Sequence, residues 1–346
     1  MGTPDVYISS LGVHLPGTVS VASAVEQGLY SAEAAELTQL TGVAVAGDLP
    51  APEMAVRAAQ GALKRYGRPA DDLDLMLYVN TWHQGPDGWP PQAYLQRHLD
   101  AGGVTTAEVR NGCNGLFSAL ELASGYLHGD PARQAAMIVA SDNFGTPMMN
   151  RWQAGHGYIP GDAASALVLT KEPGFAQLMS LRTATVPEAE EVHRTGEPLF
   201  PPSITLGRQV NFGERADRFR AKAIRSGAGT GSLLKVQGQT MVVIQQALDD
   251  AGITLGDVRR VLFLNFSRTM VEERCMNALG LPLSRSVWEY GRSIGHLGAS
   301  DHVVALEHLV ETDAVDPGDN LLLISVGPGI HLAGAVIRVV APAPWR

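Results

Sequence analysis

The 346-residue chain is predicted to adopt an α/β fold in which one unit occurs twice. Short, continuously apolar runs at 75–80 and 261–265 are typical of strands buried on both faces of a sheet. Each follows a segment with apolar residues at helical spacing, 54–67 and 241–252, which ends at glycine. Further strand pairs match, 136–142 with 321–326 and 164–169 with 334–339. This pattern predicts two βαβαβ halves, residues 1–175 and 176–346, with a site between them.

Residues 187–232 interrupt the second half. The segment is rich in proline, glycine and arginine and shows little periodicity. We expect an irregular insertion here, and long irregular segments in compact enzymes are often functional.

The composition narrows the class of protein. With 45% hydrophobic and 18% charged residues the chain is expected to be globular, and a net charge of −9 argues against nucleic acid as a partner. No apolar run reaches membrane-spanning length, and the start of the chain has no signal-peptide pattern. Two cysteines provide no disulfide framework, and no Cys/His spacing indicates a metal site. We therefore expect a cytoplasmic protein without a membrane partner.

Cys113 is the predicted nucleophile. A strand-like stretch, 105–110, leads into the turn Asn111-Gly112, which places the thiol at the start of the predicted helix 116–126. The free N–H groups of a helix N-terminus favour negative charge, and hence the thiolate. Cys275 lies in a charged helical run and is more typical of a small buried hydrophobe.

A base and its partner are predicted downstream, at His296 and Asp301 in the glycine-rich run 295–301. A carboxylate beside a histidine fixes its tautomer and stabilises the imidazolium. Their separation does not guarantee contact, and the alternative for Asp301 is a carboxylate at a helix start. Cysteine, histidine and aspartate together indicate acyl transfer through a thioester on Cys113.

Four stretches resemble the thiolase superfamily and, over almost the whole chain, ketoacyl-acyl-carrier-protein synthase III. They are the Cys113 turn, 161–169, 290–296 and 327–335. The resemblance implies duplicated halves in a five-layered α-β-α-β-α arrangement and a homodimer. It also implies an acyl-CoA or acyl-carrier-protein thioester as cosubstrate and no permanently bound cofactor.

Two positions differ from that family. Asn265 stands where the family has its catalytic histidine, and His296 stands where it has asparagine. In this the chain resembles the stand-alone acyltransferases of polyketide antibiotic pathways, such as the cervimycin-type malonyl transferases. That branch tends to carry a further histidine before the insertion, and His193 is the matching residue.

These differences favour transfer of an acyl group to a hydroxyl. Decarboxylative condensation uses two neutral donors to hold an enolate oxygen, whereas a hydroxyl acceptor needs a general base. His296 with Asp301 supplies the base, while Asn265 donates a hydrogen bond but cannot exchange a proton. The predicted acceptor is a small molecule, a sugar hydroxyl of a polyketide, and malonyl is a candidate acyl group.

The remaining predictions concern the acyl group. The N–H groups of Cys113 and Gly329 are the expected oxyanion donors. Arg151, Arg268 and Arg292 are candidates for binding a dicarboxylic acyl group. Two alternatives stay open: a condensing or starter-unit-selecting synthase that uses Cys113, and a non-catalytic partner subunit.

Overall fold

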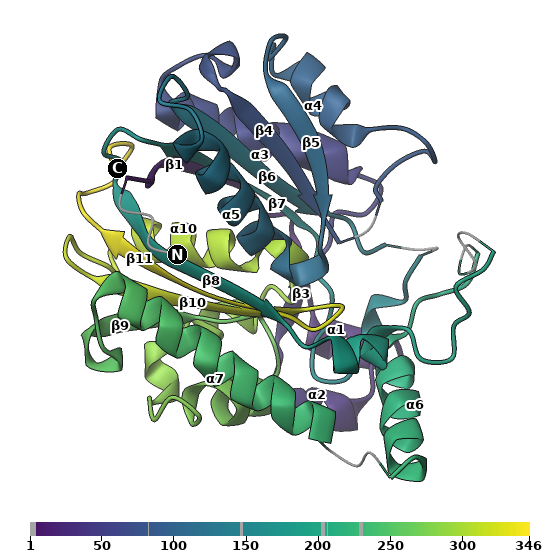
Figure 1. Ribbon diagram of the computed structural model, residues 1–346. Coiled ribbons are helices and arrows are strands. Elements are labelled where there is room, and N and C mark those ends of the chain that lie inside the picture. Colours follow the sequence, from purple (N-terminus) through teal and green to yellow (C-terminus); the bar gives the residue numbers. More distant parts are fainter. Residues whose placement is uncertain (1–4, 82, 146–147, 202–204, 206, 228–230) are drawn as a thin grey trace.

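The computed structural model describes residues 5–81, 83–145, 148–201, 205, 207–227 and 231–346 (Figure 1). The strands are β1 (Tyr7–His14), β2 (Thr18–Ser20), β3 (Gly42–Ala44), β4 (Leu75–Asn80), β5 (Thr105–Arg110), β6 (Ala135–Asp142), β7 (Ala163–Thr170), β8 (Ala176–Thr185), β9 (Val258–Leu262), β10 (Asn320–Gly327) and β11 (His331–Val339). The helices are α1 (Val21–Glu26), α2 (Ala32–Thr38), α3 (Ala51–Tyr66), α4 (Pro91–His98), α5 (Gly115–His128), α6 (Phe212–Arg225), α7 (Gly231–Ala251), α8 (Arg268–Val271), α9 (Trp288–Gly291) and α10 (Asp301–Glu311).

Across the described residues, nine strands form one sheet in the order β5-β4-β6-β7-β1-β8-β11-β10-β9. The first half of the chain contributes β5-β4-β6-β7-β1 and the second contributes β8-β11-β10-β9. The halves join where β1 pairs antiparallel with β8, through Tyr7–Gln177 and Ile8–Ala176. Strand β4 runs parallel to β5 and β6, and β9 runs parallel to β10. The predicted boundary near residue 175 falls between β7 and β8.

The sheet bends so that its two halves face each other across α5 and α10 (Figure 1). Helix α3 covers the outer face of the first half, against β1, β6 and β7, and α7 covers the second, against β8 and β11. The predicted five-layered α-β-α-β-α arrangement is confirmed.

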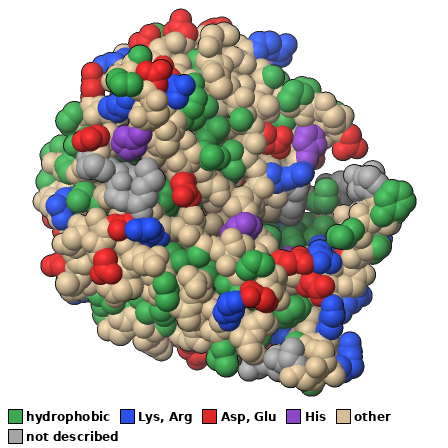
Figure 2. Space-filling model, viewed as in Figure 1, with side chains coloured by type: hydrophobic (Ala, Val, Ile, Leu, Met, Phe, Trp, Pro, Cys, Tyr) green, Lys and Arg blue, Asp and Glu red, His purple; other side chains and the backbone are tan. Residues whose placement is uncertain are grey.

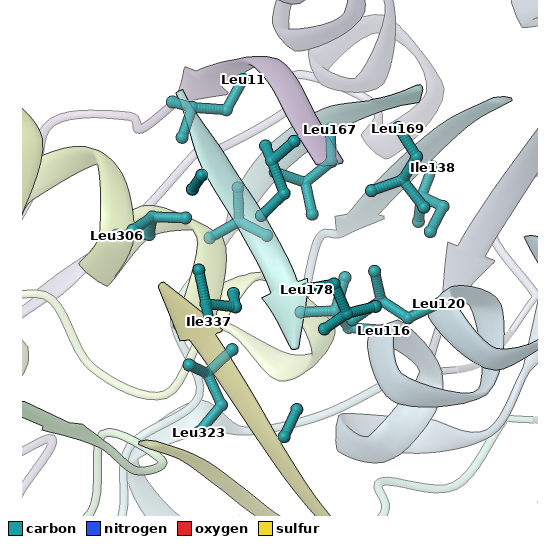
Figure 3. Close-up of a cluster of buried hydrophobic side chains, with 14 of the residues drawn as sticks. Leu11, Leu116, Leu120, Ile138, Leu167, Leu169, Leu178, Leu306, Leu323 and Ile337 are labelled. Carbon is teal, nitrogen blue, oxygen red and sulfur yellow. The ribbon is translucent and has the colours of Figure 1, made fainter. Parts of the chain in front are cut away.

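The central layer holds the main hydrophobic core (Figure 3). Leu116 and Leu120 of α5 and Leu306 of α10 meet side chains from both half-sheets, among them Ile138 of β6 and Ile337 of β11. Each fully buried aliphatic side chain contributes about 1.5–3 kcal/mol. All eight residues of β6 are buried, in keeping with the continuously apolar run 135–140 that makes up most of the strand.

The repeat extends to short turns. Asp72 lies in the 3₁₀ turn η1 (Ala70–Asp72) before β4, and Asp257 lies in the matching turn η5 (Leu255–Asp257) before β9. The predicted strand 261–265 is wrong at its end, because β9 stops at Leu262. The backbone N–H of Asn265 donates to the Asp301 carboxylate instead of a neighbouring strand.

The predicted irregularity of 187–232 is also partly wrong. The segment contains the helical turn η4 (Pro187–His193) and helix α6, and α7 already begins at Gly231. Helix α6 is rich in charged residues on its exposed face, but Phe212, Ala216, Phe219 and Ala223 form an apolar stripe at helical spacing on the other face. This pattern indicates a helix, and the prediction of an irregular segment overlooked it. Its start is fixed by the Asn211 side chain, which accepts a hydrogen bond from the Glu214 N–H. Residues 226–232, at the end of the predicted insertion, lie partly outside the described residues, at 228–230.

Candidate active site

Cys113 lies in the 3₁₀ turn η2 (Gly112–Asn114), between the end of β5 and the start of α5. Gly112 has φ +54°, and a Cβ there would lie 2.4 Å from Cδ of Pro328. The turn therefore requires glycine, both for its backbone and for the loop packed against it. That loop, between β10 and β11, includes Gly329, so the predicted oxyanion loop lies beside the thiol's turn.

His296 and Asp301 are brought to Cys113 by the turn η8 (Gly298–Ser300), which packs against η2 and the ends of β4 and β6. Cys113 Sγ lies 2.9 Å from His296 Nε2, and His296 Nδ1 lies 2.5 Å from Asp301 Oδ2. Leu297 N donates to Asp301 Oδ1 at 2.8 Å. The three residues thus form a hydrogen-bonded chain with the geometry of a nucleophile, a base and its orienting carboxylate.

Neighbouring groups fix the imidazole. The backbone N–H of His296 donates to the carbonyl oxygen of Ile159 at 2.9 Å, and the backbone carbonyl of His296 accepts from the N–H of Gly161 at 2.8 Å. The rings of Tyr158 and Phe266 pack edge-on to the imidazole, with centroid distances of 5.5 and 5.0 Å. These contacts leave His296 4% exposed.

Charge decides the protonation of His296. Burial lowers its pKa, but the charges of Cys113 and Asp301 and their hydrogen bonds outweigh burial, so the pKa lies well above 6.5. This favours an imidazolium that accompanies a Cys113 thiolate.

Asn265 lies beside this chain, 5% exposed. Its Nδ2 donates to Gly295 O at 2.9 Å, and a Cβ on Gly291 would lie 2.2 Å from its Oδ1. Its backbone N–H donates to Asp301 Oδ2 at 3.1 Å. Asn265 therefore supports the turn and the carboxylate that hold His296.

The predicted arginines lie in three different settings. Arg151 is 9% exposed and binds both carboxylate oxygens of buried Asp162, at 2.9 and 3.2 Å, and Pro160 O at 2.8 Å. Its guanidinium is fully engaged within the protein, so the prediction that it binds an acyl carboxylate is wrong. Arg268 pairs with Glu272 at 3.0 Å, and Arg292 lies over the Trp288 ring at 4.6 Å. These two remain partly exposed.

His193 is partly buried, contrary to the exposure that its charged neighbourhood suggests. Its ring packs edge-on against Phe212 at 5.8 Å. Burial lowers the pKa of His193 to about 4, and the charge of Arg215 contributes. Its Nδ1 is buried and has no hydrogen-bond partner among the described residues, so a neutral imidazole lies between η4 and α6.

Sequence reasoning missed the aromatic residues around the site. Tyr158 and Phe266 occur in loops without periodicity, so no pattern singles them out. It also missed a hollow of about 460 Å³ lined by Tyr30, Trp152, His156, Asn211, Glu214 and Asp217, among others. Gly157, at its edge, is adjacent in sequence to Tyr158. Figure 2 shows that the surface is also hollowed at the right of the view, beside the insertion, with hydrophobic side chains at the bottom.

Among the described residues, no group of three or more His, Cys, Asp or Glu side chains could hold a metal ion. None of the helices in that part of the chain is both long and apolar enough to span a bilayer.

A duplicated five-layered fold with a cysteine at the start of its central helix defines a thiolase-superfamily protein. Two family models match, the 3-oxoacyl-[acyl-carrier-protein] synthase III domain at residues 107–186 and its C-terminal domain at residues 248–339. The chain belongs to the ketoacyl-acyl-carrier-protein synthase III family, whose members transfer or condense acyl groups.

Comparison with individual proteins shows which members of the family the chain is similar to. The solved structure of ChlB3, an acyltransferase, is 56% identical with a TM-score of 0.95, and the match covers 99% of this chain and 100% of that one. The β-ketoacyl-[acyl-carrier-protein] synthase III of Mycobacterium tuberculosis is 25% identical over 98% of this chain and 97% of its own. The Aquifex aeolicus synthase III structure, at 18% identity and TM-score 0.74 over 96% of this chain and 99% of that one, shares the fold.

Proposed function

We propose that the protein is an acyltransferase that moves an acyl group from a thioester donor, through Cys113, to a hydroxyl of a small molecule. The observation that carries this proposal is the hydrogen-bonded chain Cys113–His296–Asp301. It provides a nucleophile and a general base at one point.

The cycle has two steps. In the first, the Cys113 thiolate attacks the donor's carbonyl carbon, the C–S bond to the carrier breaks, and the released thiolate takes the proton from the His296 imidazolium. In the second, an acceptor O–H attacks the acyl-enzyme while neutral His296 takes its proton at Nε2. The tetrahedral intermediate expels Cys113, which returns as thiolate beside imidazolium. The N–H groups of Cys113 and Gly329 are proposed to hold the oxyanion in both steps.

The alternative, decarboxylative condensation, has less support. It requires donors aimed at an enolate oxygen, but Asn265 directs its amide nitrogen to Gly295 O and its backbone N–H to Asp301. The likeness to ChlB3, an acyltransferase, favours the same conclusion. The third alternative, a non-catalytic subunit, does not account for the retained nucleophile.

For the donor we propose an acyl-CoA or acyl-carrier-protein thioester, malonyl being one candidate group, with no permanently bound cofactor. Arg268 and Arg292 are the remaining candidates for recognising a carboxylate or phosphate, and neutral His193 is a candidate for a hydrogen bond to a neutral substrate. For the acceptor, such as a sugar of a polyketide, we propose the hollow beside Tyr30 and Trp152, whose rings lie 5.8 Å apart. A homodimer is proposed from the family, and the free edge of β5 would allow sheet pairing.

A panel of malonyl, acetyl and aromatic acyl thioesters, on CoA and on a carrier protein, tests the proposal. Intact-mass analysis should show one acyl adduct, absent in Cys113→Ala, that is lost when a hydroxyl acceptor is added. Release of carbon dioxide with a ketoacyl product would establish the condensing alternative. Discharge only to a carrier thiol would replace the hydroxyl as acceptor.

A further inference from the structure

A second buried carboxylate lies at the same strand ends as the active site and has no place in the cycle above. Asp142, the last residue of β6, is 1% exposed. Thr81 donates to it from its backbone N at 2.8 Å and from Oγ1 at 2.9 Å, and Gln84 Nε2 lies at 3.5 Å. No arginine or lysine among the described residues pairs with Asp142, whereas neighbouring Asp162 binds Arg151. An uncompensated buried carboxylate is costly and needs a reason.

The carboxylate of Asp142 packs against the turn that joins His296 to Asp301. A Cβ on Gly298 would lie 2.9 Å from Asp142 Oδ2 and 3.0 Å from Thr81 Oγ1. Glycine is therefore favoured at position 298 because a side chain there would meet Asp142 and Thr81. It is also favoured because the backbone has φ +60°. The close approach places Asp142 behind the catalytic turn. There the positive charge of His296 lowers the pKa of Asp142, so the two groups interact through a protein interior that screens charge weakly.

We propose that Asp142 is a positioning residue that acts through His296. Its ionised carboxylate stabilises the imidazolium that accompanies the Cys113 thiolate, and its protonation makes His296 a readier proton donor. The inference rests on the proton exchange between Cys113 and His296 in the proposed function, and it explains an otherwise unfavourable buried charge.

The charge on Asp142 changes close to neutral pH. Burial raises the pKa of its carboxyl to about 7, against the hydrogen bonds from Thr81 and the charge of His296, and the negative charge of Asp162 contributes to the rise. Below that pH Asp142 is neutral. Above it, a second negative charge faces His296, raises the pKa of the imidazolium further and favours the ion pair with Cys113.

The other groups around Asp142 do not change charge in this range. Tyr78 of β4 stays neutral because burial raises its pKa well above 10. Burial lowers the pKa of His302, next to Asp301, so it too is neutral at pH 7. Asp162 is paired with Arg151. Apart from the catalytic pair itself, a step in Cys113 reactivity near pH 7 would therefore belong to Asp142.

Alkylation of Cys113 by iodoacetamide, followed by peptide mass against pH, tests this without any acyl substrate. We expect the rate constant to rise about tenfold through a step at about pH 7, equivalent to one pKa unit in the pair. Asp142→Asn should remove the step. Thr81→Val should move it to higher pH, because the lost hydrogen bond favoured the carboxylate.

Asp250→Asn is the matched control, since this carboxylate is partly exposed and pairs with Arg182, and its profile should equal that of the unchanged protein. Profiles of Asp142→Asn and the unchanged protein that superimpose would overturn the inference. If Asp142→Asn does not fold, an unmoved step in Thr81→Val would overturn it. Because the assay needs no thioester, a protein that shows the step but forms no acyl adduct would contradict the proposed function and leave the role of Asp142 standing.

Discussion

Replacing Asp301 by asparagine tests the base that the proposed transfer depends on. Asp301 is 1% exposed and accepts from His296 Nδ1 at 2.5 Å and from Leu297 N at 2.8 Å. Asparagine keeps an oxygen for Leu297, so the turn should persist. It removes the charge that stabilises the imidazolium.

The size of the effect follows from the role of the carboxylate. Replacing the carboxylate that orients a catalytic histidine by an amide can slow the reaction by about 10⁴-fold. Acyl discharge from Cys113 to the acceptor should therefore slow by about 10²–10⁴-fold, equivalent to about 3–5 kcal/mol in the barrier. The pKa of His296 should fall as well, since Asp301 helps to raise it. The thiolate–imidazolium pair exists below the raised pKa of His296, so Asp301→Asn should lose iodoacetamide reactivity across the pH range below that pKa, neutral pH included.

Rapid-quench measurement of acyl-enzyme discharge and the pH profile of alkylation provide the two readouts. Asp250→Asn makes the same chemical change at a partly exposed ion pair and should leave both the discharge rate and the pH profile within about twofold. A discharge rate in Asp301→Asn within about threefold of the unchanged protein would refute the reasoning. It would mean that His296 acts as a base without the Asp301 carboxylate.

Three further changes have expected outcomes. Arg151→Met leaves the buried Asp162 carboxylate unpaired, so the free energy of unfolding, measured by denaturant titration, should fall by about 3–5 kcal/mol. The control Arg268→Met, at a partly exposed ion pair, should lower it by at most about 1 kcal/mol. Equal losses in the two variants would contradict the structural role of Arg151. Gly112→Ala forces a Cβ into the loop opposite at a positive φ, so acyl-enzyme formation should slow at least about tenfold. Gly125→Ala, in open space on helix α5 that follows this turn, should keep full activity. Trp152→Ala removes one side of the hollow proposed for the acceptor, so KM for the acceptor should rise about tenfold while the rate of Cys113 acylation stays unchanged. A change in the acylation rate alone would show that the hollow binds the acyl donor instead.

How much the sequence could predict depends on how local each signal is. Cys113 stands out because a strand, a glycine turn and a helix follow one another within one short stretch. The contact between His296 and Asp301 was only a hypothesis, since it depends on the turn at Gly298, whose left-handed backbone no periodicity reveals. The resemblance supplied the layers and the pairing of the halves.

The features that the sequence does not predict depend on contacts between segments that are far apart in the chain. Arg151 was expected at the substrate, but its partner Asp162 lies across a loop whose course the residues do not specify. Helix α6 does have a signal of its own, an apolar stripe that includes Phe212 and Phe219, but the stripe is short and lies in a segment rich in proline, glycine and arginine. Ion pairs such as that between Glu214 and Arg218 add to the stability of the helix. Asp142 was unremarkable as the end of a strand, and only packing against Gly298 sets it apart.

The central claim is that Cys113 carries an acyl group which His296 passes to a hydroxyl. Time-resolved intact-mass analysis of protein loaded with an acyl thioester, before and after addition of a hydroxyl acceptor, tests it most directly. We predict one adduct on the Cys113 peptide, its loss on addition of acceptor, an equal amount of ester formed and no carbon dioxide released. Failure of Cys113 to take up any acyl group, or carbon dioxide released with a ketoacyl product, would contradict the claim.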